Sequence, residues 1–194
     1  MNRLSCIFEP KSVAVIGASA TLNTVGNAIF SNILLSDFQG AVYPVNPKYT
    51  HIMSVHAFKN VLSIPGTLDM AIICIPAKKV ADVLKQCVEK KVKGVIVITA
   101  GFKEIGNEGK QLEDEIISIA NKNNIVLVGP NVLGVINTQK EVQLNANFAI
   151  KPVAGNIALI SQSGAIGVAA LNYAHQHGLG ISKFVSIGNK AVIV

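Results

Sequence analysis

Short apolar segments alternate along the chain with longer segments in which apolar residues recur at helical spacing. The apolar segments, rich in Val and Ile, predict strands at residues 12–16, 41–45, 69–75, 94–99 and 125–128. The intervening segments predict helices such as 25–35, where Ile29, Ile33 and Leu34 share one face. Strands that are apolar on both faces and alternate with helices are typical of a parallel sheet covered on both sides. We therefore predict an α/β fold in which residues 1–138 form a Rossmann-like, doubly wound parallel sheet.

The same alternation begins again near residue 156. A strand is expected at 156–160, a Ser/Gly turn at 161–164, a helix at 165–177 and a last strand at 184–187. Residues 139–155 are polar or irregular in pattern, so we expect a linker there. A strand, a helix and a strand bury their apolar faces only with about 50 or more further residues. We therefore interpret 156–194 as the amino-terminal part of a second domain, apparently truncated.

Composition and charge narrow the classes of partner. The 17 Lys and Arg residues outnumber the 11 Asp and Glu residues, but they are spread along the chain, and Trp is absent. Because nucleic-acid binders concentrate basic charge and add aromatic residues, a small anionic molecule is the favoured partner. The three cysteines lie far apart, which favours neither a zinc site nor disulfides and fits a cytoplasmic protein. No apolar run approaches the roughly 18 residues of a membrane span, so we expect no membrane association.

A small-residue loop follows the first strand and leads into the first long helix. Gly17 permits the turn, Ser19 offers a hydroxyl, and Gly26 allows close approach of a ligand or of the sheet. Unpaired N–H groups at such a loop and helix start favour an anion, and a side chain at Gly17 would enter the space of a phosphate. The spacing is not the G-x-G-x-x-G of dinucleotide folds, so a purely structural turn is the alternative.

The end of the second strand discriminates between nucleotide ligands. A bound NAD ribose requires an Asp or Glu roughly 20 residues after the glycines. This sequence instead has Asn46, Pro47 and Lys48. A cation at this point suits an extra phosphate, either the 2′-phosphate of NADP or the 3′-phosphate of coenzyme A. A solvated lysine after a turn is the alternative.

Six motifs together resemble one family. They are residues 8–19, 42–48, 100–104, 129–131, 161–165 and 186–190, and they follow one another in order over essentially the whole chain. The combination is similar to the NDP-forming acyl-CoA synthetases, which are related to the α subunit of succinyl-CoA synthetase. The resemblance implies a CoA-binding domain over 1–138 and, from 156, the start of a flavodoxin-like ligase domain.

The resemblance also implies site residues. The nucleotide part of CoA would lie over the loop 17–26 with Lys48 near its phosphates, and Asn131 would hydrogen-bond the pantetheine arm or the thioester end. The implied CoA-binding residues are Gly17, Ala18, Ser19, Gly26, Asn46, Lys48, Ile75, Pro76, Ala100, Gly101 and Asn131. The alternative for Pro76 and Gly101 is that they only end their strands. Glu104 either orients its loop or caps a turn. Val132 stands where the family usually has a Cys, which puts a role for a thiol there in doubt.

Ser161, Gln162, Ser163 and Gly164 open the helix of the second domain. In the family this helix points its N-terminus at a phosphorylated histidine, and a helix N-terminus favours such an anion. The histidine is expected in a Ser-His-Thr-Gly-like context that this sequence lacks, and His51, His56, His175 and His177 are interpreted as surface or helix-end residues. We therefore expect no catalytic residue and no metal ligand in this chain.

The sequence thus predicts the CoA-binding portion of a synthetase that interconverts acyl-CoA, NDP and phosphate with carboxylic acid, CoA and NTP. CoA is the expected substrate, and ATP or ADP and Mg²⁺ would enter only through missing or partner domains, such as a nucleotide-grasp domain or subunit. A homo-oligomer is a further expected assembly. The alternatives are a catalytically inactive CoA-binding or regulatory module and an NADP-dependent oxidoreductase, the latter weakened by the absent G-x-G-x-x-G motif.

Overall fold

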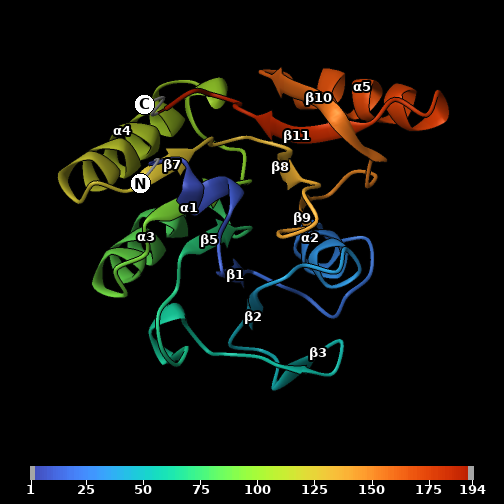
Figure 1. Ribbon diagram of the computed structural model, residues 1–194. Coiled ribbons are helices and arrows are strands. Elements are labelled where there is room, and N and C mark those ends of the chain that lie inside the picture. Colours follow the sequence, from blue (N-terminus) through green and yellow to red (C-terminus); the bar gives the residue numbers. More distant parts are fainter. Residues whose placement is uncertain (1–2, 192–194) are drawn as a thin grey trace.

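The computed structural model describes residues 3–191, which form a five-stranded sheet, a four-stranded sheet and a two-stranded β3-β4 hairpin, together with helices that pack against the two larger sheets (Figure 1). The first sheet has five parallel strands in the order β2-β1-β5-β6-β7. Their bounds are Ser12–Ile16 for β1, Ala41–Val45 for β2, Met70–Ile73 for β5, Gly94–Val97 for β6 and Val126–Val128 for β7. The strand order changes direction beside β1, which creates the switch point where open α/β sheets bind ligands. The predicted doubly wound parallel sheet is confirmed.

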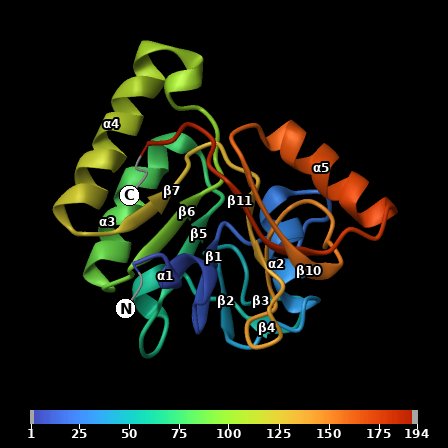
Figure 2. The ribbon, with the colours of Figure 1, turned by 45° about the horizontal axis from the view of Figure 1, so that its top comes forward.

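Helices cover both faces of this sheet (Figure 2). The helices α3 (Val80–Glu89) and α4 (Asn107–Lys122) lie on one face, and α1 (Ser5–Phe8) and α2 (Val25–Leu34) lie on the other. Alternate residues of each strand supply the two cores, because successive side chains point to opposite faces. Thus Ala14 packs in the core beneath α3 and α4, whereas Val13 packs in the core beneath α2.

Short elements connect these strands and helices. They are β3 (His51–Ile52), β4 (Val55–His56) and the 3₁₀ helices Val61–Ser63, Ala77–Lys79 and Lys103–Ile105. The 3₁₀ helix Ala77–Lys79 leads directly into α3. None of the helices in the described part of the chain is long and apolar enough to cross a membrane.

The second sheet is mixed and has four strands in the order β10-β11-β8-β9. Its strands are β8 (Gly134–Asn137), β9 (Leu144–Asn147), β10 (Ala154–Ser161) and β11 (Ile181–Ser186). β10 pairs in parallel with β11, and the other pairs are antiparallel. The helix α5 (Gly164–Gln176) covers one face, where Leu171 and Phe184 are fully buried.

The expectation of an irregular linker at 139–155 is wrong in one respect, because β9 and the start of β10 lie within it. The strand β9 reads Leu-Asn-Ala-Asn, and its polar residues conceal it from a search for apolar runs. Asn145 and Asn147 are nevertheless buried, and the backbone carbonyl of Asn147 accepts a hydrogen bond of 2.7 Å from Asn32 Nδ2 in α2. Ala146 of β9 packs in the same core as the strands of the first sheet. The two sheets therefore share one hydrophobic core and are not separate units joined only by a linker.

The strand β10 forms one edge of the second sheet. It is eight residues long and exposed over most of its length, with Ile157 46% and Ile160 70% exposed. No charged residue and no proline occurs within it.

Candidate functional site

A cleft of about 640 Å³ lies where the two sheets meet. Its walls come from the carboxyl ends of β5 and β6, the turn after β7, and the beginnings of α2 and α5. The lining residues are Val25, Cys74, Ile75, Pro76, Ile98, Thr99, Ala100, Asn131, Val132, Leu133, Phe148, Gln162, Gly164, Ala165 and Gly188. Among the described residues, no charged side chain lines this cleft. Desolvation raises the pKa of the Cys74 thiol to about 12, which keeps that group neutral as well.

The cleft brings together part of the predicted site. Ile75, Pro76, Ala100 and Asn131, predicted for CoA, share it with Gln162 and Gly164, predicted for the phosphate-facing helix end. The other predicted residues do not line it; they are Gly17, Ala18, Ser19, Gly26, Asn46, Lys48, Gly101, Ser161 and Ser163. The carboxyl ends of parallel strands meet at one sheet edge, which is why residues far apart in sequence converge here.

Hydrogen bonds join the strand ends that form the floor of the cleft. Thr99 Oγ1 donates to the carbonyl oxygen of Ile75 at 2.7 Å, which links the end of β6 to the end of β5. The backbone N–H of Asn131 donates to the carbonyl oxygen of Thr99 at 3.0 Å, which adds the turn after β7. Asn131 has a φ of 61°, in the left-handed region that Asn tolerates better than most residues. Three consecutive strand ends are therefore held in one fixed arrangement.

The loops after β1 and β2 form a second group of predicted residues beside the first sheet. Asn46 Nδ2 donates to the carbonyl oxygen of Ala18 at 2.8 Å, and Asn46 Oδ1 accepts from the backbone N–H of Lys48 at 3.0 Å. Ser19 Oγ accepts from the backbone N–H of Thr21 at 3.0 Å. Asn46 thus holds the two loops together and leaves the Lys48 side chain exposed to solvent.

Backbone packing requires glycine at Gly17 and Gly26. The sequence alone did not decide between a ligand-binding loop and a purely structural turn. Gly17 has a φ of 94°, and a Cβ added there would lie 2.5 Å from the carbonyl oxygen of Cys74. A Cβ added at Gly26 would lie 2.0 Å from the carbonyl oxygen of Gly17. The expectation that a side chain at Gly17 would enter phosphate space is therefore corrected, because it would first strike the end of β5.

The four residues predicted at the start of the second-domain helix have different roles. Ser163 is the N-cap of α5, and its Oγ accepts from the backbone N–H of Ile166 at 3.3 Å. Ser161 is buried at the end of β10 and donates from its Oγ to the carbonyl oxygen of Ser163 at 2.7 Å. Gln162 and Gly164 face the cleft. The N-terminus of α5, which carries positive partial charge, therefore lies at the cleft.

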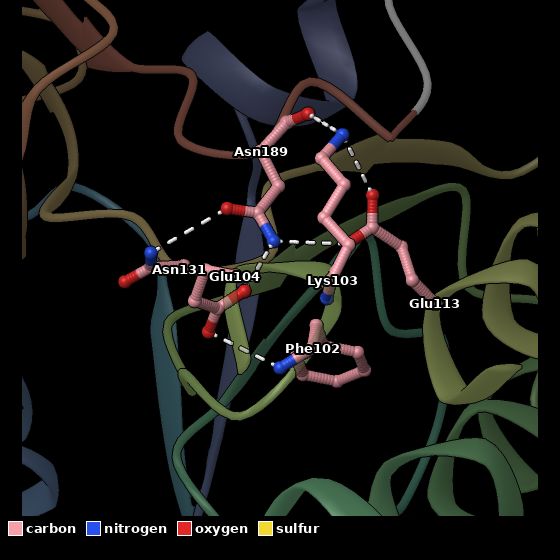
Figure 3. Close-up of polar contacts among 6 residues, drawn as sticks. All are labelled: Phe102, Lys103, Glu104, Glu113, Asn131 and Asn189. Carbon is pink, nitrogen blue, oxygen red and sulfur yellow. Dashed lines mark hydrogen bonds and ion pairs between the residues drawn. The ribbon is translucent and has the colours of Figure 1, made fainter. Parts of the chain in front are cut away.

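A polar network lies behind the loop that follows β6 (Figure 3). Glu104 Oε1 accepts from the backbone N–H groups of Gly101 at 2.6 Å and Phe102 at 3.1 Å. Glu104 Oε2 accepts from Asn189 Nδ2 at 2.6 Å. Although partial burial opposes ionisation, the hydrogen bonds from Asn189, Gly101 and Phe102 lower the pKa of Glu104. Of the two roles considered for Glu104, this geometry favours orienting its loop.

Several residues outside the predicted set also line the cleft. Cys74 and Thr99 flank predicted strand ends, so a wider search around those ends would have found them. Phe148 and Gly188 follow β9 and β11, and only the packing of the second sheet brings them to the cleft. Nothing in their local sequence predicts that approach.

The histidines lie away from the N-terminus of α5. His51 and His56 face each other across β3 and β4, with ring centroids 5.5 Å apart. His175 is in the last turn of α5, and His177 is its C-cap. Within residues 3–191, no three His, Cys, Asp or Glu side chains are grouped to hold a metal ion.

Comparisons with known proteins cover nearly all of the chain. The sequence model of the family described as "CoA binding domain" matches residues 11–138, and that of "Succinyl-CoA ligase like flavodoxin domain" matches 154–194. The chain is 48% identical over 96% of its length to acetate–CoA ligase [ADP-forming] I of Archaeoglobus fulgidus. It is 45% identical over 97% of its length to the α subunit of acetate–CoA ligase [ADP-forming] II of Pyrococcus furiosus.

A solved structure has the same fold over the whole chain. The acetyl-coenzyme A synthetase 1 of Ca. Korarchaeum cryptofilum, in complex with phosphate and ADP, is 38% identical, with a TM-score of 0.94 over 100% of this chain. The chain spans 41% of that protein, 27% of the Archaeoglobus protein and 40% of the Pyrococcus subunit.

Proposed function

The chain belongs to the family of CoA-binding domains, and on that basis we propose that it is the CoA-binding portion of an ADP-forming acyl-CoA synthetase. The single observation that carries the proposal is the uncharged cleft, which runs from the carboxyl ends of the parallel strands to the N-terminus of α5. The similarity to ADP-forming acetate–CoA ligases over almost the entire chain supports it.

The cleft suits the pantetheine arm of CoA. That arm is uncharged and carries amide groups, and the cleft offers an apolar lining with the polar side chains of Thr99, Asn131 and Gln162. Small-molecule binding sites typically have volumes of about 300–1,000 Å³ and a few polar groups at specific positions. In this proposal Asn131 hydrogen-bonds the arm, and Ile75, Pro76 and Ala100 contact it.

The phosphates of CoA are proposed to lie outside the cleft, over the loops that follow β1 and β2. Asn46 joins these loops and holds the backbone of Lys48. The exposed Lys48 ammonium supplies a positive charge for the 3′-phosphate, and the start of α2 favours an anion. Gly17 and Gly26 act here by allowing the loop to pack. Ser19 is partly exposed on the loop, whereas Ala18 is fully buried in the core beneath it.

The complete reaction is proposed to require other parts of a larger enzyme. The start of α5, with Gln162 and Gly164, would stabilise the phosphorylated group at the thioester end of the cleft. ATP or ADP, with Mg²⁺, would bind a nucleotide-grasp domain or partner subunit, as the similarity to an α subunit supports. We also propose a cytoplasmic location, because the three cysteines are free thiols.

Calorimetric titration of the purified chain tests this function. CoA should bind, dephospho-CoA should bind about tenfold more weakly because it lacks the 3′-phosphate, and NAD should hardly bind. Tighter binding of NADP than of CoA would favour the oxidoreductase alternative. If the wild-type chain binds no CoA, the proposal is wrong.

A further inference from the structure

Asn189 lies just after β11 and connects two loops of the first sheet (Figure 3). Its Oδ1 accepts from Asn131 Nδ2 at 3.4 Å. Its Nδ2 donates to Glu104 Oε2 at 2.6 Å and to Glu113 Oε2 at 2.9 Å. One amide group from the second sheet therefore contacts both a cleft-lining side chain and the carboxylate that organises the neighbouring loop.

Contacts of the backbone also fix the position of Asn189. Its N–H donates to the carbonyl oxygen of Pro130 at 3.0 Å. The preceding residue, Gly188, has no room for a side chain, because an added Cβ would lie 2.3 Å from the carbonyl oxygens of Pro130 and Asn131. Close contact with the turn after β7 thus fixes where the Asn189 amide can reach.

Two carboxylates, those of Glu104 and Glu113, and the ammonium of Lys103 lie around Asn189. Glu113 is 2% exposed, and its Oε1 lies 3.0 Å from the ammonium of Lys103, which also hydrogen-bonds the carbonyl oxygen of Asn189. Among residues 3–191, Glu104 has no lysine partner, and it accepts hydrogen bonds from the backbone and from Asn189. Loss of the Asn189 amide would therefore leave Glu104 with fewer donors and its loop less restrained.

We propose that Asn189 is a positioning residue for the CoA cleft, an inference that rests on the proposed function. Asn189 does not line the cleft, but it orients Asn131 directly and, through Glu104, holds the loop that carries Ala100. The second sheet thereby sets the shape of the cleft wall that receives the pantetheine arm. None of the hydrogen bonds that Asn189 makes within residues 3–191 reaches the loops after β1 and β2, which would hold the phosphates.

The test compares two ligands on Asn189→Ala. CoA probes the cleft, and adenosine 3′,5′-bisphosphate, which lacks the pantetheine arm, probes only the phosphate loops. We expect the variant to bind CoA about tenfold more weakly, as for loss of a hydrogen bond to a charged group, and to bind the bisphosphate with unchanged affinity. Asn172→Ala, at an exposed position of α5, is the matched control and should bind both ligands like the wild type.

A second pair of variants separates positioning from general destabilisation. Asn189→Asp keeps the shape of the side chain but places a third carboxylate beside Glu104 and Glu113, near Lys103. Its CoA affinity should be low at neutral pH and should recover in part as the pH falls and a carboxyl group becomes protonated. Glu104→Gln, at an exposed position, should also weaken CoA binding without loss of fold, which thermal unfolding would verify.

The results that would overturn the inference differ from those that would overturn the function. If Asn189→Ala and Glu104→Gln bind CoA like the wild type, Asn189 does not position the cleft. If CoA and the bisphosphate weaken equally in both variants, the residue has only a structural role. Absence of CoA binding by the wild type, in the same titration series, would instead reject the proposed function on which the inference rests.

Discussion

Gly26, at the start of α2, lies directly against the backbone of Gly17, and a Cβ added to Gly26 would stand 2.0 Å from the Gly17 carbonyl oxygen. The helix approaches the end of β1 this closely only because Gly26 has no side chain. The contact brings the first turn of α2, where Val25 lines the cleft, to its place beside β1.

The first prediction is that Gly26→Ala destabilises the fold. The methyl group would overlap backbone rather than a movable side chain, so the free energy of unfolding should fall by about 1–3 kcal/mol. Denaturant unfolding followed by circular dichroism measures this change. Gly164→Ala, where an added Cβ meets nothing within 4 Å, is the control and should unfold like the wild type. Equal stability of the two variants would contradict the packing role of Gly26.

The second prediction concerns recognition of the 3′-phosphate of CoA by Lys48. Lys48→Ala should lower CoA affinity about tenfold while leaving dephospho-CoA affinity unchanged, because only CoA presents the phosphate that the ammonium contacts. Calorimetric titration of both ligands measures the difference. Lys59→Ala, also exposed on the first domain, should leave both affinities unaltered. A preference for CoA that survives in Lys48→Ala would remove Lys48 from the phosphate site.

The third prediction is a pH dependence of stability that arises from Glu104. Its folded-state pKa is lowered, so its contribution to stability is present above the unfolded-state pKa of about 4.3 and is lost as the pH falls through the folded value. The stability gap between wild type and Glu104→Gln should therefore be largest near neutral pH and should close in acid. Denaturant unfolding at pH 7 and pH 3 would show this. A gap that does not change with pH would mean that the carboxylate charge contributes nothing.

The fourth prediction is that ATP does not phosphorylate this chain when it is incubated alone. A phosphoryl carrier must reach the N-terminus of α5, but His175 is near the other end of this 13-residue helix, about 15–20 Å away at 1.5 Å per residue. His51 and His56 belong to the short β3–β4 hairpin. Labelled ATP followed by an assay for acid-labile phosphate tests this. A phosphohistidine at any of the four positions would show that the site differs from the proposed one.

Most of the first sheet and its carboxyl edge could be predicted from the sequence. Strands such as β1 and β6 are apolar on both faces, and this pattern is typical of a parallel sheet that is covered on both sides. The strand ends at Ile75, Ala100 and Asn131 could be placed together because parallel strands present their ends at one edge. The bounds of the helices predicted at 25–35 and 165–177 shifted by only one residue, since caps such as Ser163 depend on side-chain geometry.

What could not be predicted depends on contacts between segments far apart in the chain. The strand β9 has buried asparagines. Their burial is tolerated because the Asn147 side chain hydrogen-bonds Asn145 Oδ1 and the backbone N–H of Ala149. The packing role of Gly17 required knowledge of where Cys74 lies. Asn189 belongs to the motif 186–190, but only the fold shows that it lies beside Glu104 and Asn131.

The exposed strand β10 has a practical consequence for the isolated chain. Within residues 3–191, no strand pairs with its outer edge, which lies beside exposed isoleucines and has none of the charges or prolines that natural edge strands use against intermolecular pairing. Concentrated preparations should therefore aggregate from this edge. A lysine at Ile160, which is 70% exposed, should raise solubility and keep the protein monodisperse for the titrations above.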